Sequence, residues 1–311
     1  MPVNDSKALL KGLAEQDPRA IGRAISVVEN NDDGSAEILA GLDRDRIENA
    51  LVLGITGPPG AGKSTLTSSL IHQLRSDEKR VGIIAVDPSS PISGGAILGD
   101  RIRMMEHALD PDVVVRSMAT RGRLGGLCAS AGATVRIMAA SGCEIIIIET
   151  VGVGQSEMDI VRLADITLMV LAPGFGDDIQ AMKAGLLEVA DFLVVNKSDL
   201  GGADALVMDM KQIFAAKEEE SNVSRVLQCI ASENKGTQEL LDAVQQLATY
   251  LAVKQIKAKR RKTAMDGETL DWVFEILRPL LTKKLETQTK QQQTDPRLRA
   301  KELIQEMLQS N

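Results

Sequence analysis

Residues 51–70, LVLGITGPPGAGKSTLTSSL, constrain the fold of this chain more than any other stretch. An apolar run leads into Gly57, Gly62, Lys63 and Ser64 at the spacing G-x-x-x-x-G-K-S/T, and a helical pattern follows. This is the Walker A phosphate loop, in which glycines let backbone N–H groups approach a polyphosphate at the positive end of a helix. The alternative is an incidental glycine-rich turn, but the strand before it and the helix after it favour the phosphate loop.

We therefore predict a nucleotide site. Lys63 is predicted to reach the β- and γ-phosphates, and Ser64 to bind Mg²⁺. The residues predicted to surround the phosphates are Gly57, Pro58, Pro59, Gly60, Ala61, Gly62, Lys63, Ser64 and Thr65.

Short apolar runs alternate with helical patterns from residue 51 to about residue 250. The runs are VGIIAV at 81, VVVR at 113, EIIIIE at 144, ITLMVLA at 166, FLVVN at 192 and RVLQCI at 225. Continuous apolar character indicates strands that are buried on both faces, which is typical of a parallel sheet in a doubly wound α/β fold. Ligands bind such sheets at the carboxyl ends of the strands, so the polar residues that end these runs are candidates for chemistry.

The two ends of the chain predict helices. Residues 1–48 form a helical extension, in which Asp17-Pro18 provides an N-cap and a first-turn proline and 30–34 breaks the pattern. We assign 49–250 to the nucleotide-binding domain and 251–311 to a helical C-terminal arm. Asp266-Gly267 is predicted to interrupt this arm, and Pro296 to start its last helix.

The arm carries an apolar stripe after the predicted break. Its members recur every three or four residues: Leu270, Val273, Leu277, Leu280 and Leu281. Such a stripe requires a cover, which is either the same chain or a second copy.

A base-binding element is predicted where the run FLVVN ends, at Asn196-Lys197-Ser198-Asp199. The Asp199 carboxylate can accept both the ring N–H and the exocyclic amine of guanine, whereas adenine lacks that pair of donors and leaves the carboxylate unsatisfied. A polar loop with no such role is the alternative. Backbone N–H groups at Ala231-Ser232 could reach the guanine carbonyl oxygen. The predicted base-binding residues are Asn196, Lys197, Asp199, Ala231 and Ser232.

Carboxylates at three places could complete a magnesium site with Ser64. Glu149 ends the run EIIIIE and begins a variant of the D-x-x-G element, in which Gly152 could offer its N–H to the γ-phosphate. Asp87 ends the run at 81, and Asp100 lies in a glycine-bounded stretch. Each carboxylate alone is also compatible with an ordinary charge at a strand end. The predicted catalytic residues are Lys63, Asp87, Asp100 and Glu149, and the predicted metal ligands are Ser64, Asp87, Asp100 and Glu149.

Composition restricts the partners. A net charge of −7 argues against nucleic acid or an anionic membrane, and the basic run from Lys254 to Lys262 is interpreted as a solvated helix face. Three cysteines without C-x-x-C spacing and two isolated histidines indicate neither disulfides nor a Cys/His metal site. We expect a cytoplasmic protein, since no signal peptide and no apolar run of about 18 residues is recognised.

Six stretches in this order resemble the family of MeaB, ArgK and MMAA, within the SIMIBI class of P-loop GTPases. They are GPPGAGKST, VDPSSPISGGAILGDRIRM, RGRLGGL, ETVGVGQSE, LAPGFGDDIQAMKAG and NKSDL. The resemblance covers nearly the whole chain. It implies a P-loop NTPase fold, GTP/GDP and Mg²⁺ as ligands, and a homodimer formed through the C-terminal arm.

The resemblance also implies a function. Such GTPases are chaperones of adenosylcobalamin-dependent acyl-CoA mutases, typically methylmalonyl-CoA mutase, and gate cofactor loading. The implied switch regions are Ser93 to Arg103, Val151 to Asp159 and Gly174 to Gly185. The implied switch and partner-coupling residues are Gly152, Gln155, Asp177, Asp178, Gln180 and Lys183. Because Val153 stands where many small GTPases have a water-orienting glutamine, slow intrinsic hydrolysis is predicted.

Two other functions remain open. One is a kinase, in line with an older label of such sequences as amino-acid transport kinases, although no feature marks an acceptor pocket. The other is metal delivery by a GTPase of the same fold group, although no Cys- or His-rich tract is present.

Overall fold

A computed structural model describes residues 5–87, 109–119, 130–150, 156–174, 184–287 and 295–309. Within these ranges a seven-stranded sheet forms in the order β3-β2-β4-β1-β5-β6-β7, and every pair of neighbours is parallel. The strands are β1 (Leu51–Thr56), β2 (Val81–Asp87), β3 (Val113–Ala119), β4 (Ile145–Thr150), β5 (Ile166–Leu171), β6 (Phe192–Val195) and β7 (Val226–Gln228). The predicted parallel α/β fold is confirmed, and each predicted run forms a strand.

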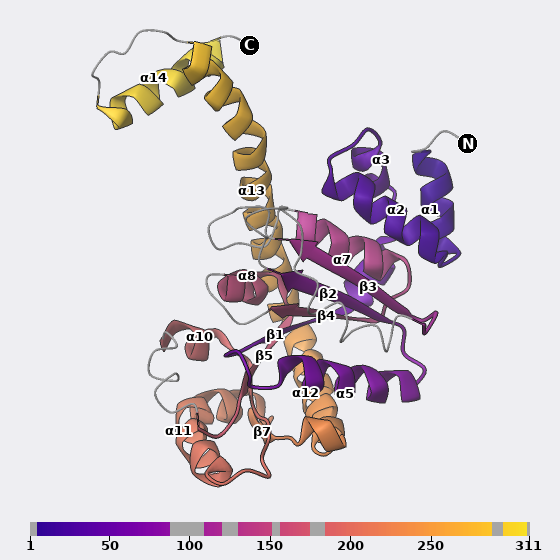
Figure 1. Cartoon of the computed structure of the whole chain (residues 1–311), viewed down its shortest axis with the longest axis vertical. Helices are drawn as coiled ribbons and strands as arrows, with labels where there is room; N and C mark the ends of the chain where they lie inside the picture. Colours follow the sequence, from indigo (N-terminus) through magenta and orange to yellow (C-terminus); the bar gives the residue numbers. More distant parts are fainter. Residues whose placement is uncertain are drawn as a thin grey trace. The chain divides into compact units, whose positions relative to one another are not determined.

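Helices lie on both faces of the sheet (Figure 1). Those before and between the strands are α1 (Ser6–Ala14), α2 (Pro18–Glu29), α3 (Ser35–Ala40), α4 (Arg44–Asn49), α5 (Lys63–Ser76), α7 (Ser130–Ala140), α8 (Ser156–Leu163), α10 (Ala184–Val189) and α11 (Ala203–Ser221). After β7 follow a short 3₁₀ helix η1 (Ala231–Glu233), α12 (Thr237–Val253), α13 (Ile256–Thr287) and α14 (Pro296–Gln309). Among the described residues, no helix has both the length and the apolar character needed to cross a membrane.

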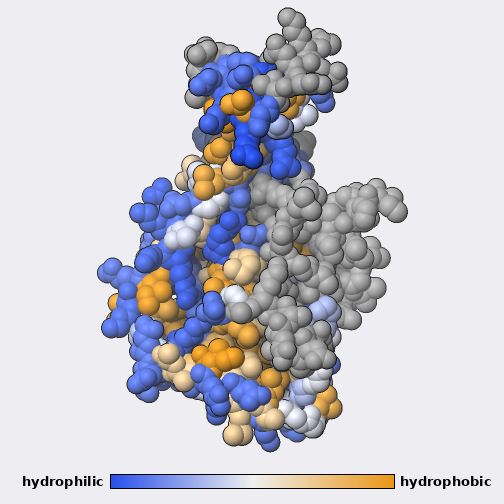
Figure 2. Space-filling view, turned by 90° about the vertical axis from the view of Figure 1, so that its left-hand side faces the viewer, coloured by the Kyte–Doolittle hydropathy of each residue, from blue (hydrophilic) through white to orange (hydrophobic). Residues whose placement is uncertain are grey.

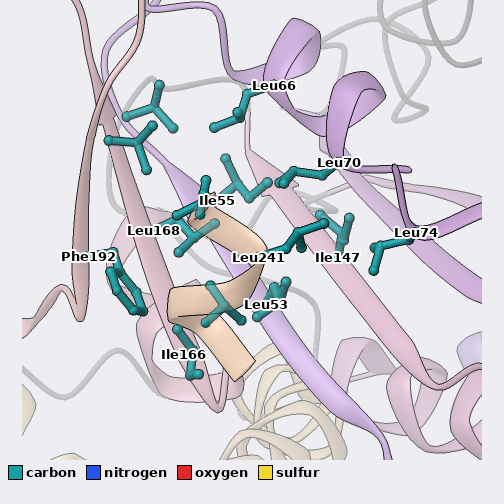
Figure 3. Packing of buried hydrophobic residues seen from close by; sticks show 14 of the residues in the cluster. Leu53, Ile55, Leu66, Leu70, Leu74, Ile147, Ile166, Leu168, Phe192 and Leu241 are labelled. Atoms are coloured by element: carbon teal, nitrogen blue, oxygen red, sulfur yellow. The ribbon is translucent and has the colours of Figure 1, made fainter. Parts of the chain in front are cut away.

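The alternation of side chains along each strand builds two cores. Leu53 and Ile55 of β1 point to one face, where they pack with Leu66 and Leu70 of α5 and with Leu241 of α12 (Figure 3). The opposite face is covered by α7 and α8 around β1, β2 and β4, and by α10 and α11 around β5 and β6. Because both faces are buried, the strands need the continuous apolar runs that the sequence shows.

The N-terminal helices extend the second core. Buried residues of α2, among them Ile21, Ile25 and Val28, share a cluster with Ile137 and Met138 of α7. As predicted, Asp17 caps α2, where its side chain accepts from the Arg19 N–H at 3.0 Å, and Pro18 occupies the first turn. The extension therefore lies on the outside of α7.

The chain divides into two units, Met1–Ala264 and Met265–Asn311. The second unit contains the later part of α13 and all of α14. Within it, Lys284 and Arg299 both form ion pairs with Glu306, and Leu303 is buried. Other apolar side chains of this unit are exposed, and Figure 2 shows hydrophobic residues at the surface among hydrophilic ones. Those of α13 are Met265, Leu270, Val273, Phe274, Ile276, Leu280 and Leu285.

The predicted interruption at Asp266-Gly267 is wrong, because α13 continues through both residues. A glycine inside a helix costs about 1 kcal/mol relative to alanine, which neighbouring helix formers can offset. The break instead lies at Lys254 and Gln255, between α12 and α13, where Gln255 has a positive φ of 57°.

The interpretation of the basic run as a solvated helix face is also wrong in part. Arg261 donates to both carboxylate oxygens of Asp165, at 2.8 and 2.6 Å, and Arg260 to both oxygens of Asp191, each at 2.8 Å. Lys257 donates to the carbonyl oxygens of Glu48 and Ala50. Burial lowers the pKa of Lys257. These cations therefore fasten the start of α13 to the sheet.

The two aspartates stand at the amino ends of neighbouring strands and are almost fully buried. Asp165, before β5, accepts from the Val52 N–H of β1 at 3.0 Å. Asp191, before β6, accepts from the Thr167 N–H of β5 at the same distance. We call Asp165, Asp191, Arg260 and Arg261 the amino-edge clamp, because they join three strand starts to one helix.

Candidate functional site

The predicted phosphate loop connects β1 to α5 at the carboxyl edge of the sheet. Gly57 has a φ of 140°, and a Cβ there would lie 2.1 Å from the carbonyl oxygen of Val170 in β5. Gly62 has a φ of 90°, and its Cβ would lie 2.3 Å from Asn196 Nδ2. Both positions therefore demand glycine for conformation and for space.

Lys63 is the first residue of α5, and its side chain is buried. Its ammonium group donates to the carbonyl oxygens of Gly57 at 2.8 Å and Pro58 at 3.0 Å. The lysine therefore lies along the loop, with its charge beside the N-terminus of α5. A polyphosphate bound there would meet the ammonium group and the helix amides together.

Ser64 and Glu149 come from neighbouring elements and meet at the same edge. Glu149 pairs in register with Ile55 of β1, and its side chain is buried at the end of β4. The Ser64 hydroxyl donates to Glu149 Oε1 at 2.6 Å. A hydroxyl and a carboxylate in contact provide the hard oxygen atoms that Mg²⁺ prefers, so the residues present fit the ion.

The described residues contain no cluster of three or more Cys, His, Asp or Glu side chains that could hold a metal. Magnesium in nucleotide sites needs few protein ligands, because phosphate oxygens and water supply the others. Asp87 ends β2, next to β4, but its side chain lies outside what the structure describes. Asp100 lies outside the described residues altogether.

Two of the predicted base-binding residues, Asn196 and Lys197, contact the phosphate loop. Asn196, buried at the end of β6, donates through Nδ2 to the carbonyl oxygen of Ala61 at 3.0 Å. Its Oδ1 accepts from the Ala231 N–H at 3.1 Å. The Lys197 ammonium donates to the Gly60 carbonyl oxygen at 2.8 Å, while Asp199 is exposed. Asn196 therefore ties the phosphate loop to the segment after β7.

The Ala231 N–H was expected to reach the guanine carbonyl oxygen, but in this structure it donates to Asn196 Oδ1. Sequence reasoning also missed that Asn196 and Lys197 bind the phosphate loop. No local signal could have revealed these contacts, because they join positions separated by more than 130 residues. The predicted switch and partner-coupling residues lie outside the described part of the chain: Gly152, Gln155, Asp177, Asp178, Gln180 and Lys183.

Comparisons with known proteins agree with this geometry. A family model described as methylmalonyl Co-A mutase-associated GTPase MeaB matches residues 21–290. A protein of Pyrococcus abyssi, named only as a GTPase, is 45% identical over 262 residues, which cover 82% of this chain and 80% of that protein. GTPase ArgK of Escherichia coli is 37% identical over 231 residues, which cover 72% of this chain and 68% of that protein.

A solved structure supports the fold. It is described as a LAO/AO transport system kinase, and the match covers 97% of each chain with a TM-score of 0.62 at 24% identity. At this identity the likeness concerns the fold alone. Because the family model spans most of the sequence and the relatives share more than a third of the aligned residues, this chain belongs to the MeaB family and is a P-loop GTPase.

Proposed function

We propose that this GTPase is a cytoplasmic chaperone of an adenosylcobalamin-dependent acyl-CoA mutase, with methylmalonyl-CoA mutase as the first candidate. It would use GTP hydrolysis to gate loading of the mutase cofactor and to protect the enzyme. The observation that carries this proposal is the match of residues 21–290 to a family named for its association with that mutase.

The proposal assigns roles at the phosphate end of the site. Lys63 would bind the β- and γ-phosphates, because its ammonium group already lies along the loop that would cradle them. Ser64 and Glu149 would hold Mg²⁺ with Asp87 and Asp100, and the ion would supply positive charge against the phosphates. The Ser64–Glu149 hydrogen bond supports this assignment, because it brings both oxygen atoms to one place.

Other residues would bind the guanine base. Asp199 would accept from the two guanine donors, and its exposed position leaves it accessible to a ligand. Asn196 would hold the base-binding segments against the phosphate loop. Ser232 would present its backbone N–H to the guanine carbonyl oxygen, and Ala231 would hold this segment in place through the hydrogen bond of its own N–H to Asn196 Oδ1.

The main experiment measures GTP turnover with and without methylmalonyl-CoA mutase. We expect slow intrinsic hydrolysis and at least about tenfold acceleration by the cognate mutase, a barrier change of roughly 1.4 kcal/mol. Substitution of Asp178, Gln180 or Lys183 should remove most of that acceleration and leave the intrinsic rate nearly intact. Equal loss of both rates would place these residues in the basal site. Absence of any acceleration would count against the mutase as partner.

We further propose that the chain forms a homodimer through the exposed apolar side chains of α13. Leu270 is 59% exposed and Phe274 is 64% exposed. The other exposed apolar positions of this helix add apolar surface, and burial of such surface against a second copy is favourable. Replacing both with glutamate should convert the dimer to a monomer in sedimentation experiments. A wild-type protein that already sediments as a monomer would contradict the proposal.

One further measurement separates hydrolysis from a kinase reaction. Labelled γ-phosphate from GTP should appear in inorganic phosphate. Its appearance on a protein or an amino acid instead would favour the kinase alternative.

A further inference from the structure

One hydrogen bond joins α5 to the segment that follows β7. The Ser69 hydroxyl donates to Asn234 Oδ1 at 2.6 Å, across 165 positions of sequence. Ser69 is buried, and it lies five residues after Ser64 on the same helix, about 7.5 Å along its axis. The helix that starts at the phosphate loop therefore also contacts the predicted base-binding segment.

The Ser69 contact differs from that of another serine on this helix. The Ser76 hydroxyl donates to the carbonyl oxygen of His72, four residues earlier, as helical serines commonly do. The hydroxyl of Ser69 instead reaches away from its own helix. Ser69 therefore has a tertiary role that Ser76 lacks.

Asn234 ends the turn that contains Ala231 and Ser232, two of the predicted base-binding residues. It follows η1 with a left-handed φ of 53°, and its carbonyl oxygen accepts from the Thr237 hydroxyl at 3.1 Å. Ile230 and Lys235 exchange backbone hydrogen bonds of 3.0 and 3.2 Å and close the turn. The turn is thus a small unit that is closed by its own backbone hydrogen bonds.

This closed turn has two side-chain attachments near its ends. At its start, the Ala231 N–H donates to Asn196, which also contacts the phosphate loop. At its end, Asn234 accepts from Ser69. Two attachments at opposite ends of the turn restrain its orientation as well as its position.

We infer that Ser69 and Asn234 are positioning residues for recognition of the carbonyl edge of guanine. This inference rests on the proposed base site at Asp199 and Ala231-Ser232. The hydrogen bond would set the distance between the residues that bind the phosphates and the backbone groups that face the guanine oxygen. Asp199 belongs to a different loop, so recognition of the guanine amine should not depend on Ser69.

The test compares dissociation constants for GDP, 6-thio-GDP and IDP. The sulfur of 6-thio-GDP is a weaker hydrogen-bond acceptor and probes the carbonyl edge. IDP lacks the exocyclic amine and probes the Asp199 edge. We expect Ser69→Ala to weaken GDP binding roughly three- to tenfold, as loss of one positioned hydrogen bond would do, and 6-thio-GDP binding less. The ratio of the GDP and IDP constants should stay unchanged.

Three variants control this test. Ser76→Ala removes a hydroxyl from the same helix and should change no constant. Asn234→Gly tolerates the left-handed backbone but removes the acceptor, so it should reproduce the Ser69→Ala pattern from the exposed side of the contact. Asn234→Asp retains an acceptor oxygen and should keep the wild-type constants.

Failure of the inference and failure of the proposed base site give different results. A wild-type protein that binds all three nucleotides equally would overturn the base site. A wild type that discriminates them, with Ser69→Ala and Asn234→Gly weakening all three equally or not at all, would overturn the inference. In that case the hydrogen bond would stabilise the fold only.

Discussion

The two edges of the sheet carry similar residues in different situations. At the carboxyl edge, Lys63 lies along the phosphate loop and Asp199 is exposed. At the amino edge, Asp165 and Asp191 are buried and each binds one arginine through both carboxylate oxygens. A charged residue beside a strand is therefore a candidate for chemistry at one edge and a structural fastening at the other.

The difference follows from the direction of the strands. All neighbouring strands are parallel, so every carboxyl end meets at one edge, where the loops after β1 and β6 come together. The amino ends meet at the opposite edge, where the chain returns from helices and the start of α13 crosses. Substitutions at the amino edge should therefore change stability, whereas substitutions at the carboxyl edge should change nucleotide binding and hydrolysis.

The largest expected effect is on stability at the amino edge. Asp165→Ala should lower the free energy of unfolding by about 3 to 5 kcal/mol, because it leaves Arg261 without its carboxylate and the Val52 N–H without its acceptor. Urea denaturation measures the change. Glu15→Ala is the control, since its ion pair with Lys11 is exposed and contributes less than about 1 kcal/mol. Equal effects of the two substitutions would contradict a structural role for the clamp.

The next effect is on catalysis at the carboxyl edge. Lys63→Ala should slow GTP hydrolysis at least about 100-fold, a barrier change of roughly 2.7 kcal/mol, because positioned positive charge stabilises phosphoryl transfer. Its effect on the free energy of unfolding should be smaller than that of Asp165→Ala. Single-turnover hydrolysis and urea denaturation on the same samples test both statements. If Lys63→Ala lost stability but not activity, the contrast between the edges would fail.

A smaller effect concerns the base. Asp199→Asn should weaken GDP binding by about 1 to 3 kcal/mol and improve binding of xanthosine diphosphate, because the amide can donate to the extra carbonyl of xanthine. Calorimetric dissociation constants for both nucleotides measure the exchange. Retained preference for GDP would remove Asp199 from the base site.

The smallest effect involves a buried thiol at each edge. Burial raises the pKa of Cys143, before β4, to about 11 and that of Cys229, after β7, to about 12, from an ordinary value of 9.0. The unfolded chain therefore loses its thiol protons first as the pH rises above 9. Each buried thiol therefore makes its full contribution to the free energy of unfolding below pH 9. At pH 10 that contribution should be smaller by about 1 kcal/mol.

Cysteine-to-alanine variants test this pH dependence. Urea denaturation at pH 8 and pH 10 should show a smaller drop for Cys143→Ala and for Cys229→Ala than for the wild type. Because both thiols are buried, the two edges should behave alike here, unlike the charged groups. If one variant lost as much stability between pH 8 and pH 10 as the wild type, the thiol that this variant lacks would already be ionised in the folded protein at pH 10.

The sequence alone determined the strands and the phosphate loop. Continuous apolar runs predicted each strand, and the glycine spacing before Lys63 placed the loop, because these signals depend only on neighbouring residues. The predicted break at Asp266-Gly267 was wrong. It also depended only on neighbouring residues, but the signal was weak and α13 continues through both positions. The roles assigned to the predicted site residues stay predictions, including those of Asp100, Gly152, Gln155, Asp177, Asp178, Gln180 and Lys183, which lie outside the described residues.

The contacts of the charged and polar groups follow from the tertiary structure instead. In the sequence, Arg261 is one cation in a basic run. In the fold it binds Asp165, which lies 96 positions earlier. The sequence marks Ser69 only as a serine in a helical segment, but in the fold its hydroxyl binds Asn234. Such pairs depend on which strands become neighbours and on where the chain crosses their ends. The order of strands in a sheet is set by the packing of the whole core, so a local pattern of residues cannot contain it.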